Sequence, residues 1–87
     1  MIDTKQYLIK DRYEISYSHK HNGSRITVKG YGKIKRYAYA DFMRRLRNTH
    51  PELKSILKEF TLVEVEVKDL LTNEVGKGLA QIYWKEV

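Results

Sequence analysis

The sequence predicts a two-layer α+β fold, in which an antiparallel sheet built from two β-hairpins carries helical structure on one face. Residues 12–31 and 63–86 alternate apolar and polar side chains around a turn, as half-buried strands do. Residues 38–60 instead repeat their apolar side chains at helical spacing. The resulting order, ββααββ, favours one sheet with one kinked helix or two short helices between the hairpins.

The first hairpin is defined by its turn, because Asn22-Gly23 is a dipeptide that tolerates positive φ at both central positions. A two-residue turn there fixes the register and brings the apolar faces of both strands together. The expected pairs are Tyr17 with Val28, Ile15 with Gly30, Ser16 with Lys29, Glu14 with Tyr31, and Lys20 with Arg25. Glycines at 30 and 32 suit a bend, a strand end or a close approach of another backbone.

Two helical segments are expected between the hairpins. Residues 38–48 form an amphipathic helix whose apolar side chains fall within about 140° of arc, opposite an arginine-rich back. A second short helix is expected from Thr49, because Thr49 and Glu52 have the spacing of a capping box and Pro51 is tolerated in a first turn. Its expected core-facing side chains are Leu53, Ile56, Leu57 and Phe60.

The second hairpin is expected to turn at Asn73-Glu74. That turn sets Val67 opposite Ala80, Val65 opposite Ile82 and Val63 opposite Trp84, which makes Trp84 a core residue. Gly76-Lys77-Gly78 resembles part of a phosphate-binding loop, but it lacks the glycine spacing of such loops and the helix that follows them. We therefore interpret these three residues as part of the turn. The two hairpins leave free sheet edges, which could pair between two copies of the chain to form a homodimer.

Length and composition indicate one domain over residues 1–87, with the structure of residues 1–11 left open. The chain has no cysteine, which excludes thiolate zinc sites and catalytic cysteines. No apolar run is long enough for a membrane span, and MIDTKQYLIK lacks the apolar stretch of a secretory signal, so we expect a cytoplasmic protein. Small size and basic charge also suit a protein of a phage or other mobile element.

The charge is concentrated in the first half of the chain. Residues 1–50 hold twelve basic and four acidic side chains, a balance of +8, whereas residues 51–87 hold five basic and seven acidic, a balance of −2. Tyrosines interleave with these cations, and basic groups beside aromatic rings are typical of nucleic-acid binding. The candidate binding residues are Lys20, Arg25, Lys29, Tyr31, Lys33, Lys35, Arg36, Tyr37, Arg44, Arg45 and Arg47.

The same residues would also suit a soluble basic surface or a protein-interaction module, such as an inhibitor or accessory factor that docks on an acidic or nucleic-acid-binding protein. His19 and His21 lack further ligands at metal-binding spacing, and we interpret Glu64 with Glu66 as a solvent-facing pair. We therefore expect no catalytic site, no metal and no cofactor. The leading expectation is a non-catalytic module that binds DNA or RNA.

Overall fold

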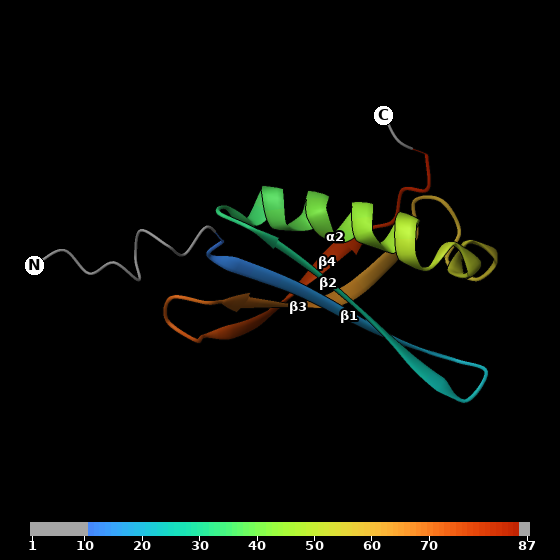
Figure 1. The fold of residues 1–87 in the computed structure, drawn as a ribbon, viewed down its shortest axis with the longest axis horizontal. Helices are drawn as coiled ribbons and strands as arrows, with labels where there is room; N and C mark the ends of the chain where they lie inside the picture. The colour runs from blue at the N-terminus through green and yellow to red at the C-terminus, as the bar shows by residue number, and fades with distance from the viewer. Residues whose placement is uncertain (1–10, 86–87) are drawn as a thin grey trace, which may run out of the picture.

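The computed structural model describes residues 11–85, so the question left open for the N-terminal segment lies almost entirely outside the described residues. It has a four-stranded antiparallel sheet in the order β2-β1-β3-β4, with one helix packed against it (Figure 1). This is the predicted two-layer α+β fold. Its elements are β1 (Tyr13–His21), β2 (Ser24–Gly32), α2 (Lys35–Thr49), the 3₁₀ helix η1 (Pro51–Ser55), β3 (Leu62–Asp69) and β4 (Val75–Gln81).

The register of the first hairpin is confirmed. Tyr17 pairs with Val28 and Lys20 with Arg25, and the intervening pairs follow the same register. The turn has the expected backbone, with φ of 50° at Asn22 and 81° at Gly23. The turn dipeptide and the apolar alternation therefore act together to fix this hairpin.

Gly30 and Gly32 allow α2 to lie directly on β2. A Cβ atom added to Gly30 would lie 2.2 Å from the backbone nitrogen of Phe42, and one added to Gly32 would lie 2.4 Å from that of Ala38. Both distances are far inside van der Waals contact. The strand runs through both glycines and ends at Gly32, and the helix then returns along it.

The core lies between α2 and the sheet. Phe42 is fully buried at its centre, with its ring edge-on to Tyr17 at a centroid distance of 6.3 Å. The buried side chains are Ile15, Tyr17, Val28, Ala38, Phe42, Met43, Leu46, Leu53, Leu57, Val63, Val65, Ala80 and Ile82. The helix packs over β2 and β1, which leaves the flank towards β4 less covered.

The prediction of a second short helix that begins at Thr49 is wrong in detail. Thr49 is the last residue of α2, and its hydroxyl donates to the carbonyl oxygen of Arg45 instead of capping a new helix. The following segment is a single 3₁₀ helix, in which Leu53 is buried. Ile56 and Phe60 are exposed, because the five-residue 3₁₀ helix ends before it could repeat an α-helical stripe. No helix among residues 11–85 combines the length and apolar character needed to cross a membrane.

The predicted register of the second hairpin is also wrong. Val63 pairs with Ala80 and Val65 with Gly78, a shift of four residues from the expected pairing. The shift is even, so the valines still face the core. Gly76-Lys77-Gly78 consequently lies inside β4, and the interpretation of this tripeptide as turn geometry is wrong.

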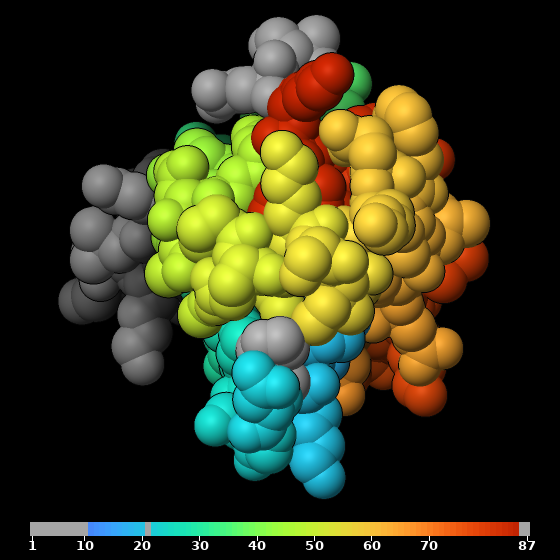
Figure 2. Space-filling model, turned by 90° about the vertical axis from the view of Figure 1, so that its right-hand side faces the viewer, coloured from blue at the N-terminus to red at the C-terminus, as the bar shows by residue number. Residues whose placement is uncertain are grey.

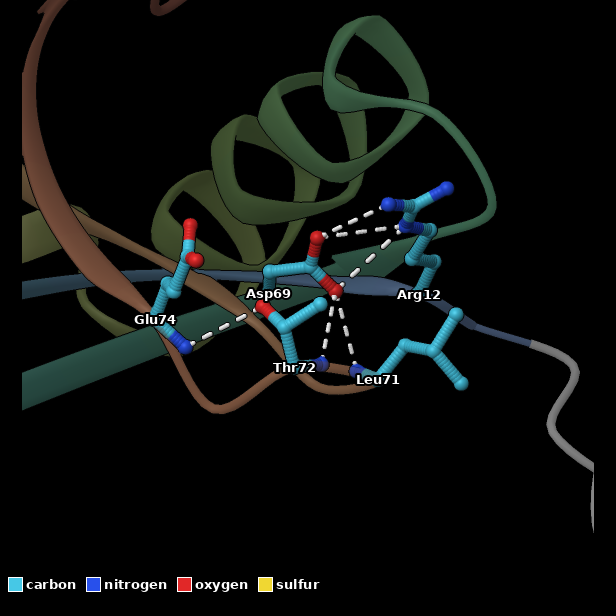
Figure 3. Close-up of polar contacts among 5 residues, drawn as sticks. All are labelled: Arg12, Asp69, Leu71, Thr72 and Glu74. Atoms are coloured by element: carbon cyan, nitrogen blue, oxygen red, sulfur yellow. Dashed lines mark hydrogen bonds and ion pairs between the residues drawn. The ribbon is translucent and has the colours of Figure 1, made fainter.

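The cause is the side chain of Asp69, which starts the turn earlier than the Asn73-Glu74 dipeptide suggests (Figure 3). Its carboxylate accepts hydrogen bonds from the backbone N–H of Leu71 at 2.9 Å and of Thr72 at 3.4 Å. An ion pair with Arg12 at 3.0 Å holds the same carboxylate. The hydrogen bond from Arg12 is the main reason why the pKa of Asp69 is lowered.

Trp84 is not paired with Val63, because β4 ends at Gln81. The indole is half-buried against the core, and its Nε1–H donates to the carbonyl oxygen of Leu57 at 2.5 Å. The backbone N–H of Trp84 donates to the carboxylate of Glu59 at 2.6 Å. Trp84 therefore ties the chain after β4 to the connector between η1 and β3.

Candidate functional site

The cations of the first hairpin are split between its outer end and its edge. Lys20 and Arg25 are cross-strand partners at the end of the hairpin. Figure 2 shows this end, in blue and cyan, projecting from the body of the molecule beyond the last turn of α2. Two like charges directly opposite each other disfavour the pair unless an anion lies between them.

A groove of about 430 Å³ lies at the free edge of β2 and brings together three of the candidate binding residues. Lys29 and Tyr31 line it from β2, and Arg45 lines it from α2. The Arg45 guanidinium carbon lies 5.2 Å from the centroid of the Tyr31 ring, a cation–π contact. Burial, and then a hydrogen bond to Glu14, raise the pKa of Tyr31, so its hydroxyl stays neutral at pH 7.

Asp41 organises this groove from the first half of α2. Its carboxylate accepts the backbone N–H of Tyr31 at 2.9 Å and pairs with Arg44 at 2.6 Å and Arg45 at 3.0 Å. It therefore covers an outward-facing N–H of an edge strand and holds Arg45 over the Tyr31 ring. We call Thr27, Lys29, Tyr31, Asp41, Arg44, Arg45 and Thr49 the β2 surface.

Burial of the Asp41 carboxyl raises its pKa, but the hydrogen bonds from Tyr31 and Arg44 and the attraction of both arginines outweigh burial, so the pKa is lowered. The contacts of charged Asp41 therefore stabilise the fold above its ordinary pKa of 3.8 and are lost as the pH falls below that value.

Replacing Asp41 by asparagine is expected to lower the free energy of unfolding by about 1 kcal/mol at pH 7, because charge-assisted hydrogen bonds become neutral ones. The deficit relative to the wild type should shrink as the pH falls below 3.8, where the wild-type carboxyl also loses its charge. Urea unfolding over a pH series measures the difference. A deficit that is constant down to strongly acidic pH would show that the charge of Asp41 is not what stabilises the contact.

The other candidate residues before Arg44 gather at the N-terminal end of α2. Lys33 precedes the helix and is exposed, and the Lys35 ammonium lies 5.7 Å from the centroid of the Tyr13 ring. The Arg36 guanidinium lies 5.5 Å from the ring centroid of Tyr37, which is 54% exposed. Tyr37 therefore offers a solvent-facing ring beside a cation.

Arg47 lies apart from the β2 surface. It follows Arg45 by two residues, which is about 200° around a helix. Its guanidinium donates to the carbonyl oxygen of Tyr83 at 3.3 Å, on the flank of α2 that faces β4. The arginine-rich back of the helix is thus divided between two flanks, which the charge count could not show.

The open face of the sheet, opposite α2, carries charges of both signs, because it holds carboxylates together with Lys20, Arg25, Lys29, Lys68 and Lys77. Glu14 lies on β1, and Glu64 and Glu66 lie on β3, so carboxylates occupy the two central strands. Lys77 of β4 pairs with Glu64 at 3.2 Å. A polyanion would meet repulsion at the centre of this face.

Two histidines, His19 and His50, have local partners. His19 Nδ1 lies 2.9 Å from the Tyr17 hydroxyl, and His50 Nδ1 lies 3.0 Å from a carboxylate oxygen of Glu52. Within the described part of the chain, no three His, Cys, Asp or Glu side chains converge in a way that could hold a metal ion.

Three contributors to the β2 surface, Thr27, Asp41 and Thr49, were missed from the sequence. Thr27 and Thr49 carry no signal of their own, whereas the spacing of Asp41 from Arg44 and Arg45 was visible as ion-pair spacing on a helix. Comparison with protein-family models, curated proteins and solved structures returned no match. The chemistry of the surfaces is therefore what indicates a function.

Proposed function

We propose that this protein is a non-catalytic nucleic-acid-binding module of the cytoplasm, which contacts a phosphate backbone at the β2 surface. The observation that carries this proposal is the groove in which Asp41 holds the guanidinium of Arg45 over the Tyr31 ring, beside Lys29. An arginine held in one place loses less side-chain entropy when it binds phosphate. Its planar donors match two phosphate oxygens, and Lys29 adds a second charge.

The cations on either side extend this site along the strand. Lys20 and Arg25 lie beyond one end of the β2 surface, and Lys33 and Arg36 lie beyond the other. A nine-residue strand spans roughly 30 Å, which is the axial length of about nine base pairs of duplex DNA. The exposed ring of Tyr37 at one end is available to stack on an unpaired base.

The distribution of acids supports the edge of the sheet, rather than its open face, as the binding surface. Asp41 is the one acidic side chain between Lys20 and Arg47. Its single negative charge pairs with two arginines, so one positive charge is left over. The open face has carboxylates on its two central strands. A backbone that follows β2 and the adjoining side of α2 stays away from Glu64 and Glu66 on β3, and the Glu14 carboxylate is engaged by the Tyr31 hydroxyl.

Fluorescence anisotropy with labelled single-stranded DNA, single-stranded RNA and duplex DNA tests the proposal. We expect binding at about 50 mM salt that weakens steeply towards about 200 mM, because cations on phosphates release counterions. Unlabelled polyglutamate of matched charge is the competitor that represents an acidic protein partner. Absence of binding at low salt, or displacement by polyglutamate as readily as by oligonucleotide, would contradict the proposal.

A further inference from the structure

The two free edges of the sheet differ in how they are protected. At the β2 edge, Asp41 accepts the outward N–H of Tyr31, and Arg25 and Lys29 add charge along the strand. Charged side chains and covered backbone groups are the means by which proteins prevent strand-to-strand association. The β2 edge is therefore protected against pairing.

The β4 edge lacks this protection. The exposed side chains of Val75 and Leu79, which are 58% and 64% accessible, flank Lys77, the only charged residue of the strand, and Lys77 pairs with Glu64. No other described strand pairs with the side of β4 that faces away from β3. A seven-residue edge with two glycines and one charge is an exposed template for another strand.

The backbone groups that face outward from β4 follow from its pairing with β3. Ile82 directs its N–H and its carbonyl oxygen towards the β3 side, to Thr61 and Phe60. Because successive residues of a strand alternate in direction, residues 75, 77, 79 and 81 present their N–H and C=O groups to solvent. These four residues can form a complete antiparallel ladder with a partner strand.

We propose that β4 pairs antiparallel with β4 of a second copy of this chain, about a two-fold axis at Gly78, to form a continuous eight-stranded sheet. This register uses the whole strand, because Val75 then pairs with Gln81 of the other copy and Lys77 pairs with Leu79. Moving the axis by one residue to Lys77 would set the two lysines directly opposite each other.

The charges around β4 favour a second copy as the partner. In this register the end of β4 next to Glu74 lies beside the opposite end of the second strand, near Tyr83. Arg47 donates to the carbonyl oxygen of Tyr83, so Glu74 of each copy lies towards the end of the interface that holds Arg47 of the other. The contact is self-complementary, as a two-fold interface requires, and each favourable approach occurs twice.

Space on the helix side also permits the pairing. The helix packs over β2 and β1 rather than β4. An apolar groove of about 450 Å³ lies between α2 and β4, with Met43 and Leu79 in its lining. The two-fold axis places both helices on the same face of the joined sheet, so neither helix blocks the β4 edge. This inference does not depend on nucleic-acid binding.

Sedimentation equilibrium over a concentration series reaching about 500 μM tests the dimer. The wild type is expected to show a monomer–dimer equilibrium, and Leu79→Lys is expected to raise the dissociation constant at least about tenfold, because it sets two lysine pairs opposite each other across the interface. The matched control is Ile56→Lys, which places the same charge at another exposed apolar position, outside the sheet. It should dimerise like the wild type.

A charge exchange separates loss of the interface from loss of the fold. Leu79 pairs with Glu64 of its own chain, so the lysine introduced by Leu79→Lys gains an acidic cross-strand neighbour within the monomer. Adding Lys77→Glu to Leu79→Lys creates two opposite-charge pairs across the interface and should restore dimerisation. A wild type that stays monomeric throughout the series, or a double variant that stays as dissociated as Leu79→Lys, would overturn the proposal.

Discussion

Replacing Gly30 by alanine is expected to lower the free energy of unfolding by about 3 kcal/mol. The added methyl group would lie 2.2 Å from the Phe42 backbone nitrogen and 2.4 Å from its Cα atom. Because the obstructing atoms belong to the helix backbone, no side-chain rotation relieves the clash. The helix must move off β2 and lose packing around Phe42.

Gly76→Ala is the matched control, because a Cβ atom at Gly76 meets nothing within 4 Å. Its free energy of unfolding should stay within about 0.5 kcal/mol of the wild type. Urea denaturation with circular dichroism measures both variants. Equal stability of the two variants would mean that α2 does not lie on β2 at Gly30.

The same movement would disturb the β2 surface, because the contact between Asp41 and Tyr31 depends on how close α2 lies to the strand. Gly30→Ala is therefore expected to weaken oligonucleotide binding as well as stability. The glycine that permits close packing and the acid that holds Arg45 are parts of one arrangement.

The first hairpin was predictable in full because two independent signals agree. Asn22-Gly23 specifies a two-residue turn, and the alternation about it gives the same register. The second hairpin lacked that agreement. Its alternation gave the correct face, but the register depended on hydrogen bonds from the Asp69 side chain and on its ion pair with Arg12, 57 residues away in the sequence. A long-range contact of this kind leaves no local pattern.

The end of α2 was obscured by an ambiguous threonine. Thr49 can cap a following helix or donate back to a carbonyl oxygen in the preceding turn, and the spacing to Glu52 favoured the first. In the structure it donates to Arg45, and His50 takes the N-cap position of η1 without a side-chain hydrogen bond. The conformation of the connector is set instead by Leu53 and Leu57, whose side chains are buried in the core.

The candidate site was predictable as a segment but not as a surface. Charge counting locates the basic stretch from Lys20 to Arg47. The division of that stretch follows from folding, because α2 returns along β2 and brings Arg45 next to Lys29 while it turns Arg47 towards β4. Which cations share a surface is therefore a property of the packed helix.

Removing the two cations of the groove is expected to cause the largest loss of binding. Lys29→Gln with Arg45→Gln keeps the side-chain stems and removes both charges that line the β2 groove. If each contacts one phosphate, affinity at about 50 mM salt should fall roughly tenfold or more. Arg44 still pairs with Asp41, so the fold should persist.

The matched control is Lys54→Gln with Lys58→Gln, which removes the same charge from exposed positions in and after η1. Both double variants have the same net charge, so a difference between them reports on location alone. The control is expected to bind almost as well as the wild type.

The most direct test of the central claim, that the β2 surface binds a phosphate backbone, is the salt dependence of binding for the wild type and these two double variants. The slope of the logarithm of affinity against the logarithm of salt concentration should become shallower by about 1.4 on single strands, or about 1.8 on duplex DNA, for Lys29→Gln/Arg45→Gln. It should be nearly unchanged for Lys54→Gln/Lys58→Gln. Equal slopes for the two double variants would contradict the account.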